Sequence, residues 1–110
     1  MNTLFLLLCA HALADFPLQG EFIAKAKNRH TPAFNVPVGQ KPMKVWFHAL
    51  TAHSLIHGGF VYLITGSLAL GVAEVIAHWL IDYGKCENWY GIHADQGLHI
   101  GCKVAWAVLA

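Results

Sequence analysis

Hydrophobic residues form four long segments along this chain, and polar stretches separate them. The pattern predicts four membrane-spanning helices, over residues 3–23, 45–65, 67–83 and 92–110. A helical span needs about 17–25 mostly apolar residues. Because the first apolar run ends near Pro17, its span has to continue past that proline to reach this length. We therefore expect an all-α, four-helix transmembrane bundle that forms a single domain over residues 1–110.

The polar stretches give the expected bundle an orientation. Residues 25–44 hold five of the seven Lys and Arg residues and three prolines, which is typical of a loop. Lys85 lies in a second loop, over residues 84–91, and Gly66 marks a tight turn between the second and third spans. Under the positive-inside rule both loops are cytoplasmic. This predicts a protein of the bacterial inner membrane with both termini in the periplasm.

The composition also indicates a membrane environment for the protein. Hydrophobic residues make up 56% of the chain and charged residues 12%, about half the charged share of a soluble domain. A lipid bilayer is therefore the expected partner. The net charge of +1 lacks the basic excess of nucleic-acid-binding proteins, so no nucleic-acid partner is expected. The first apolar run carries His11 and Asp15 without a preceding positive region, and we interpret it as a retained helix rather than a signal peptide.

Each expected span carries His or carboxylate residues four positions apart. The sets are His11 and Asp15, then His53 and His57, then Glu74, His78 and Asp82, and finally Asp95 and His99. Residues at this spacing share one face of a helix, and facing helices of a bundle can aim such side chains at a common point. An ionised Asp at the centre of a span costs about 2.5–3.5 kcal/mol, so these faces are expected to point inward.

The depth of these residues provides a second argument. At a rise of about 1.5 Å per residue, the topology places every set in the cytoplasmic half of the bilayer. Because that topology was derived from the Lys and Arg residues alone, the common depth of the sets is partly independent of their four-residue spacing. Imidazole and carboxylate ligands favour zinc, with Mn, Fe or Ni as alternatives, over Ca and Mg. We predict one or two divalent metal ions with ligands drawn from His11, Asp15, His53, His57, His78, Asp82, Asp95 and His99.

Other polar residues near these sets receive supporting roles. Glu74 is our choice for a general base or a bridging ligand. Gln19, Lys85 and Gln96, near the cytoplasmic surface, are expected to orient a polar substrate. Lys103 shares the stripe of Asp95 and His99, and we expect it to form an ion pair within the site rather than to extend towards the surface.

Four ordered motifs carry a family resemblance over nearly the whole chain. They are His11-Ala-Leu-Ala-Asp15-Phe-Pro-Leu-Gln19, His53-x-x-x-His57-Gly58, Glu74-x-x-x-His78-x-x-x-Asp82-x-x-Lys85 and Asp95-Gln96-x-x-His99. The chain resembles an uncharacterised family of histidine-rich bacterial and phage membrane proteins that carry a domain of unknown function. That family is distantly similar to membrane-bound metal-dependent hydrolases. The resemblance implies hydrolytic activity but names no substrate.

Three functions stay open at this point. The first is a metal-dependent hydrolase that acts on a phosphate ester or a lipid headgroup, with a small polar or lipid substrate entering from the cytoplasmic side. The second is a metal or proton translocator, which would need polar residues in the outer halves of the spans, and these halves are mostly apolar. The third is a phage-type membrane effector with a structural metal site. The oligomeric state, including a homo-oligomer, is also open.

Overall fold

The computed structural model describes residues 2–31 and 44–110, and throughout these residues the chain is helical, without strands. The five helices are α1 (Asn2–Asp15), α2 (Gly20–Ala26), α3 (Trp46–Thr65), α4 (Leu68–Cys86) and α5 (Ile92–Leu109). The expected all-α class is thus confirmed, with a short fifth helix, α2, that the sequence did not separate from the first span. Most of the loop expected over residues 25–44 lies outside the described residues.

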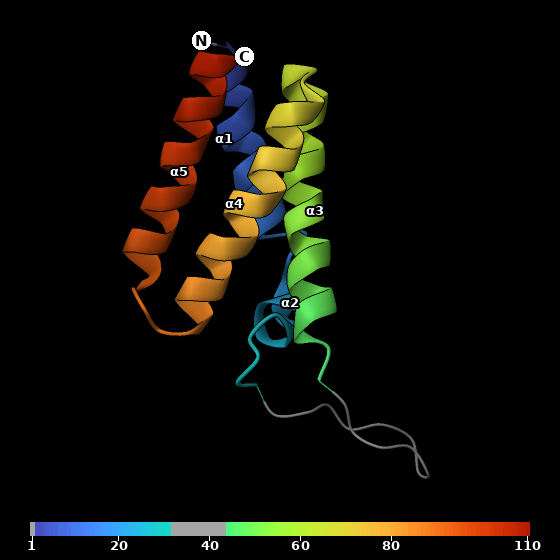
Figure 1. Cartoon of the computed structure of the whole chain (residues 1–110), viewed down its shortest axis with the longest axis vertical. Helices are drawn as coiled ribbons and strands as arrows, with labels where there is room; N and C mark the ends of the chain where they lie inside the picture. The colour runs from blue at the N-terminus through green and yellow to red at the C-terminus, as the bar shows by residue number, and fades with distance from the viewer. Residues whose placement is uncertain (1, 32–43) are drawn as a thin grey trace.

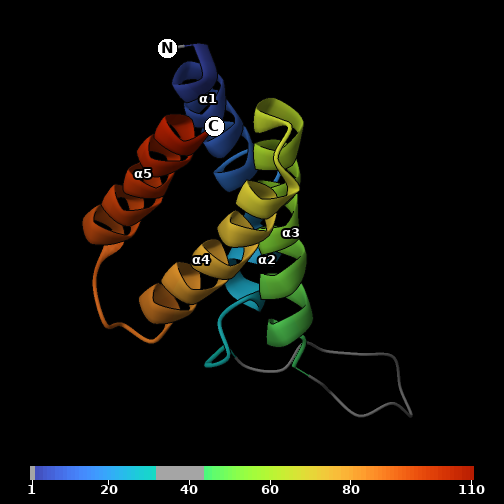
Figure 2. The ribbon, with the colours of Figure 1, turned by 45° about the horizontal axis from the view of Figure 1, so that its top comes forward.

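The four long helices surround a shared interior (Figure 1). α3 contacts α1 and α4, and α5 contacts the same two helices, so each long helix packs against two other long helices. α2 packs against α3 at the end of the bundle away from the two termini, as the second view in Figure 2 also shows. This arrangement brings one face of every long helix to the centre.

The first expected span differs from the structure because it is broken after Asp15. α1 ends at that residue, residues 16–19 form a turn, and α2 is bent by 84° relative to α1. Pro17 has no backbone N–H, and its ring would clash with the preceding turn of a continuous helix. Gly20 follows with a φ of 64°, which glycine adopts without steric cost. The other three expected spans agree with α3, α4 and α5 to within three residues.

α3 and α4 approach each other closely where two glycines meet. A Cβ atom at Gly58 would lie 2.7 Å from the carbonyl oxygen of Gly71, and one at Gly71 would lie 3.0 Å from that of Gly58. Because glycine has no Cβ atom, the two helix backbones can approach each other directly at this point. The close contact sets the inward faces of α3 and α4 directly beside each other, where their histidines can meet.

The buried side chains are unusually polar. Five histidines, four carboxylates and two lysines are buried among the described residues, whereas Phe5, Leu63 and Val108 are 68%, 78% and 78% exposed. In water, charged side chains are almost never buried unless they are paired. By length and composition, none of the described helices alone could cross a membrane, although α1 and α2 taken together across their bend could.

Candidate metal centre

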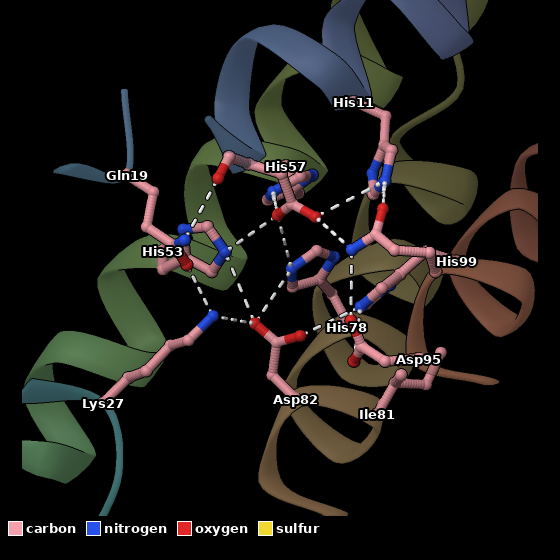
Figure 3. Close-up of polar contacts among 12 residues, drawn as sticks. His11, Gln19, Lys27, His53, His57, His78, Ile81, Asp82, Asp95 and His99 are labelled. Carbon is pink, nitrogen blue, oxygen red and sulfur yellow. Dashed lines mark hydrogen bonds and ion pairs between the residues drawn. The ribbon is translucent and has the colours of Figure 1, made fainter. Parts of the chain in front are cut away.

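The inward faces of the long helices form one cluster of ionisable side chains, much of which Figure 3 draws. All eight expected ligands belong to this cluster, Glu74 adjoins it through His78, and each of these nine residues is 8% exposed or less. Because residues four positions apart follow one another along a helical face, each long helix contributes a stripe rather than a single residue. The structure therefore brings together in one buried cluster the residues that the sequence assigned to one site.

A first set of donor atoms converges on the Asp15 carboxylate. Asp15 Oδ1 lies 2.9 Å from His57 Nε2, 3.2 Å from His53 Nε2 and 3.8 Å from His78 Nε2. His78 Nε2 is buried and has no hydrogen-bond partner among the described residues. A tetrahedral zinc site with bonds of about 2.0–2.1 Å places neighbouring ligand atoms roughly 3.4 Å apart. The three distances from Asp15 Oδ1 bracket that value, and all four donor atoms lie within 4.8 Å of one another.

A second set surrounds the Asp82 carboxylate. Asp82 Oδ1 lies 2.9 Å from His99 Nε2, and Asp95 Oδ1 lies 3.4 Å from the same nitrogen. Asp95 Oδ1 is buried without a hydrogen-bond partner in the described part of the chain. The other Asp82 oxygen, Oδ2, is 3.3 Å from His78 Nε2 and 3.4 Å from His53 Nε2. Asp82 thus links the two sets.

Glu74 lies on the far side of His78 from the Asp15 carboxylate. Its Oε1 is 3.2 Å from His78 Nδ1 and accepts a hydrogen bond from Lys103 Nζ at 2.5 Å, while its Oε2 accepts one from Trp106 Nε1 at 2.6 Å. A carboxylate that holds the second nitrogen of an imidazole fixes the ring for metal binding. These contacts orient His78, and the expected role of Glu74 as a general base or a bridging ligand stays a prediction; a carboxylate oxygen of Glu74 lies within 4.8 Å of donor atoms of His78 and His99. The contacts of Glu74 also provide the ion pair expected of Lys103.

The three residues expected to orient a substrate occupy different positions. Gln96 connects two carboxylates, because its Nε2 donates to Asp15 Oδ2 and to Asp95 Oδ2, both at 3.1 Å. Its Oε1 lies 3.0 Å from His11 Nε2. Gln19 donates to the backbone oxygen of Asp15 at 3.0 Å. Lys85 is half-buried in the last turn of α4. Gln19 and Gln96 are therefore part of the cluster's hydrogen-bond network, and the substrate roles of all three stay predictions.

Lys27 is a charged residue of the cluster that the sequence pattern did not predict, and Trp106, the donor to Glu74, is a second unpredicted member. Lys27 was expected in a solvated loop, but it is buried and its Nζ lies 2.9 Å from Asp82 Oδ2 and 2.5 Å from Gln19 Oε1. Nothing in the spacing of residues 25–44 separates Lys27 from the other basic residues there. The one available signal was charge, since the carboxylates of the expected spans outnumbered their single lysine, Lys103.

The buried charges of the described residues do not cancel by themselves. Four carboxylates and two ammonium groups leave a formal charge of −2 when the histidines are neutral. The rings of His57 and His78 stack with centroids 3.7 Å apart, and those of His78 and His99 with centroids 4.1 Å apart. Two imidazolium rings at such distances would repel each other. One divalent cation would neutralise the cluster and leave the stacked rings uncharged.

Comparison with known families agrees with part of the expected resemblance. The model of a family described as a protein of unknown function (DUF3307) matches residues 3–109. No curated protein and no solved structure matches the chain. The resemblance to an uncharacterised family is thus confirmed, and the likeness to metal-dependent hydrolases stays a prediction.

Removing the ammonium group of Lys103 should destabilise the protein, because Glu74 would stay buried without its cation. We expect Lys103→Met to lower the free energy of unfolding by about 3–5 kcal/mol, measured by denaturant titration in detergent with a chelator present. Lys85→Met removes the same charge from a half-buried position and should cost less than about 1 kcal/mol. The double variant Lys103→Met/Glu74→Gln removes the unpaired carboxylate as well. If it is no more stable than Lys103→Met alone, the unpaired Glu74 carboxylate is not what destabilises Lys103→Met.

Proposed function

The chain belongs to the DUF3307 family of proteins of unknown function, and we propose that it is a membrane-embedded, metal-dependent hydrolase. One observation carries the proposal: four donor atoms from three helices lie within 4.8 Å of one another in the buried interior. They belong to Asp15, His53, His57 and His78. Three imidazoles and one carboxylate favour zinc, with Mn, Fe or Ni as alternatives.

A bilayer suits the distribution of polar and apolar side chains in this fold. In a bilayer only the outward face of each helix would contact lipid. The mean hydropathy of a helix, however, averages over all of its residues, including those of the inward stripe. The buried His, Asp and Glu residues therefore lower the mean hydropathy of α3, α4 and α5 without being in contact with lipid. Large apolar side chains such as Leu63, Ile76 and Val108 are exposed on the outside. Intramembrane ionisable residues that face a bundle interior in this way usually mark a functional site.

The positions of the basic residues support an orientation. Arg29, Lys44 and Lys85 lie at the end of the bundle away from the termini, because they flank α2, the start of α3 and the end of α4. Under the positive-inside rule this end faces the cytoplasm of a bacterial cell and both termini face the periplasm. The donor sets would then lie nearer to the cytoplasmic side.

The proposed chemistry follows from the donor atoms and their supports. A bound divalent ion would polarise a substrate oxygen and lower the pKa of a bound water towards about 7. Glu74 would hold the His78 ring, and Gln96 would hold the carboxylates of Asp15 and Asp95 in fixed positions. Hydrolysis of a phosphate ester consumes one water and releases phosphate and an alcohol. A phosphate ester or a lipid headgroup fits the depth of the centre below the cytoplasmic face.

The structure favours the hydrolase over the translocator. Among the described residues, Glu74 and Lys103 are the buried charged side chains nearest to the termini. Leu7 and Val61 are buried further along α1 and α3 in that direction. The buried charges therefore reach towards one face of the bundle only. A translocator would need polar groups on both sides of its central site. An effector with a structural metal is separated from the hydrolase by an activity measurement.

Membrane insertion and orientation are tested by cysteine labelling. In a variant with its three native cysteines changed to serine, Ala110→Cys should react with a membrane-impermeant maleimide in spheroplasts. Asn88→Cys should react only after lysis, because it lies in the loop between α4 and α5. The reverse pattern would invert the orientation, and recovery of the protein in the soluble fraction would exclude membrane insertion.

Metal binding is tested by elemental analysis of the detergent-purified protein. The wild type should hold one equivalent of a divalent metal, and His78→Ala should weaken binding by at least about tenfold because it removes a donor of the first set. His48→Ala is the matched control, since His48 is exposed on the same bundle and should have no effect. A wild-type protein free of metal would end the hydrolase proposal and leave protonated histidines as the balancing charges.

Hydrolysis is tested with a chromogenic phosphate ester and with phospholipid vesicles, each incubated with the purified protein. Turnover of one of them should disappear on chelation and return when zinc is added back, because the metal activates the attacking water. His78→Ala should lower the rate at least about 100-fold. Bound metal without turnover of either substrate would contradict the hydrolase and favour the structural alternative.

A further inference from the structure

Lys27 is a buried cation at a carboxylate that both donor sets share. It follows the last residue of α2, and its side chain is 8% exposed. Figure 3 shows its ammonium group approaching Asp82 from the side of Gln19. Asp82 Oδ2 lies 2.9 Å from this ammonium, 3.4 Å from His53 Nε2 and 3.3 Å from His78 Nε2, both of the first set. Asp82 Oδ1 lies 2.9 Å from His99 Nε2 of the second set.

The chain positions Lys27 by contacts on both of its sides. Gln19 accepts a hydrogen bond from its Nζ at 2.5 Å. Two residues further along, Arg29 Nη2 donates to Glu87 Oε2 at 3.0 Å, and His30 Nε2 lies 2.9 Å from the same oxygen. Hydrogen bonds from Arg29 and His30 lower the pKa of Glu87 to about 2, so its carboxylate is charged at neutral pH. These contacts hold Lys27 in position beside Asp82.

The second donor set has the groups of a cation site. One atom each from Asp82, Asp95 and His99 lies within 4.8 Å of the other two, and all three residues are buried. Asp95 Oδ1 points into this set without a hydrogen-bond partner among the described residues. A metal ion bound there would share the Asp82 carboxylate with the Lys27 ammonium, and the two cations would repel each other in a poorly solvated interior.

We propose that the Lys27 ammonium takes the place of a second divalent cation and limits the centre to one metal ion. With Lys27 in position, the buried charge of −2 is neutralised by one ion in the first set. Without Lys27 the charge becomes −3, and the second set can take a second transition-metal ion such as Zn²⁺. The inference rests on the metal-binding part of the proposed function and not on hydrolysis.

The test is a Zn²⁺ titration of the metal-free protein by calorimetry, with bound zinc counted by elemental analysis after dialysis. The wild type should bind one equivalent, and Lys27→Met should bind two. Lys25→Met is the matched control, because Lys25 lies on the same helix, is exposed and pairs only with Glu21 at 2.7 Å in the described structure. It should keep one equivalent. Asp95→Asn added to Lys27→Met should abolish the second equivalent and keep the first, since Asp95 belongs to the second set alone.

The outcomes separate this inference from the proposed function. No zinc bound by the wild type would overturn both. One equivalent in the wild type and one in Lys27→Met would overturn the inference alone, as would two equivalents in the wild type. Should Lys27→Met fail to fold, Lys27→Gln replaces it, because glutamine removes the charge while keeping a hydrogen-bond donor for Asp82. One equivalent in that variant would equally overturn the inference.

Discussion

Balance of charge inside the ring of four helices is the constraint on which this structure depends. Four carboxylates are buried among the described residues, and each one faces a histidine, a lysine or an amide. An ionised carboxylate left alone in such an interior would cost several kcal/mol, so the helices can pack only in an arrangement that supplies these partners. Each long helix therefore turns its stripe of His and carboxylate residues towards the shared interior, where the carboxylates have partners.

The break after Asp15, which Pro17 and Gly20 permit, serves the same constraint. A straight first helix would carry the residues after Pro17 away from the centre. By stopping α1 at Asp15, the chain leaves this carboxylate among His53, His57 and Gln96, and the bend of 84° lets α2 return Lys27 to the interior. The bend that ends α1 thus completes the cluster.

If the protein binds metal as proposed, its stability and metal binding would be linked. A ligand that binds the folded state alone stabilises that state, and in a buried set of neutral imidazoles and carboxylates a metal ion would also supply the missing positive charge. The stacked rings of His57, His78 and His99 would repel one another if neighbouring rings were protonated together. Glu74, Lys103 and Trp106 form a hydrogen-bonded group behind His78, so the orientation of this ring is fixed by the protein itself.

The sequence by itself determined the helical class, the positions of α3, α4 and α5, and the inward stripes with their expected ligands. These features depend on periodicity, and a spacing of four residues puts side chains on one helical face whatever the surroundings are. Only the tertiary structure decided which atoms share a carboxylate, how Glu74 supports His78, and that Lys27 enters the cluster. The contact of Lys27 with Asp82 joins residues 55 positions apart. No local pattern encodes such a contact, because it arises from the bend after Asp15 and from the charge that the packed helices leave unbalanced.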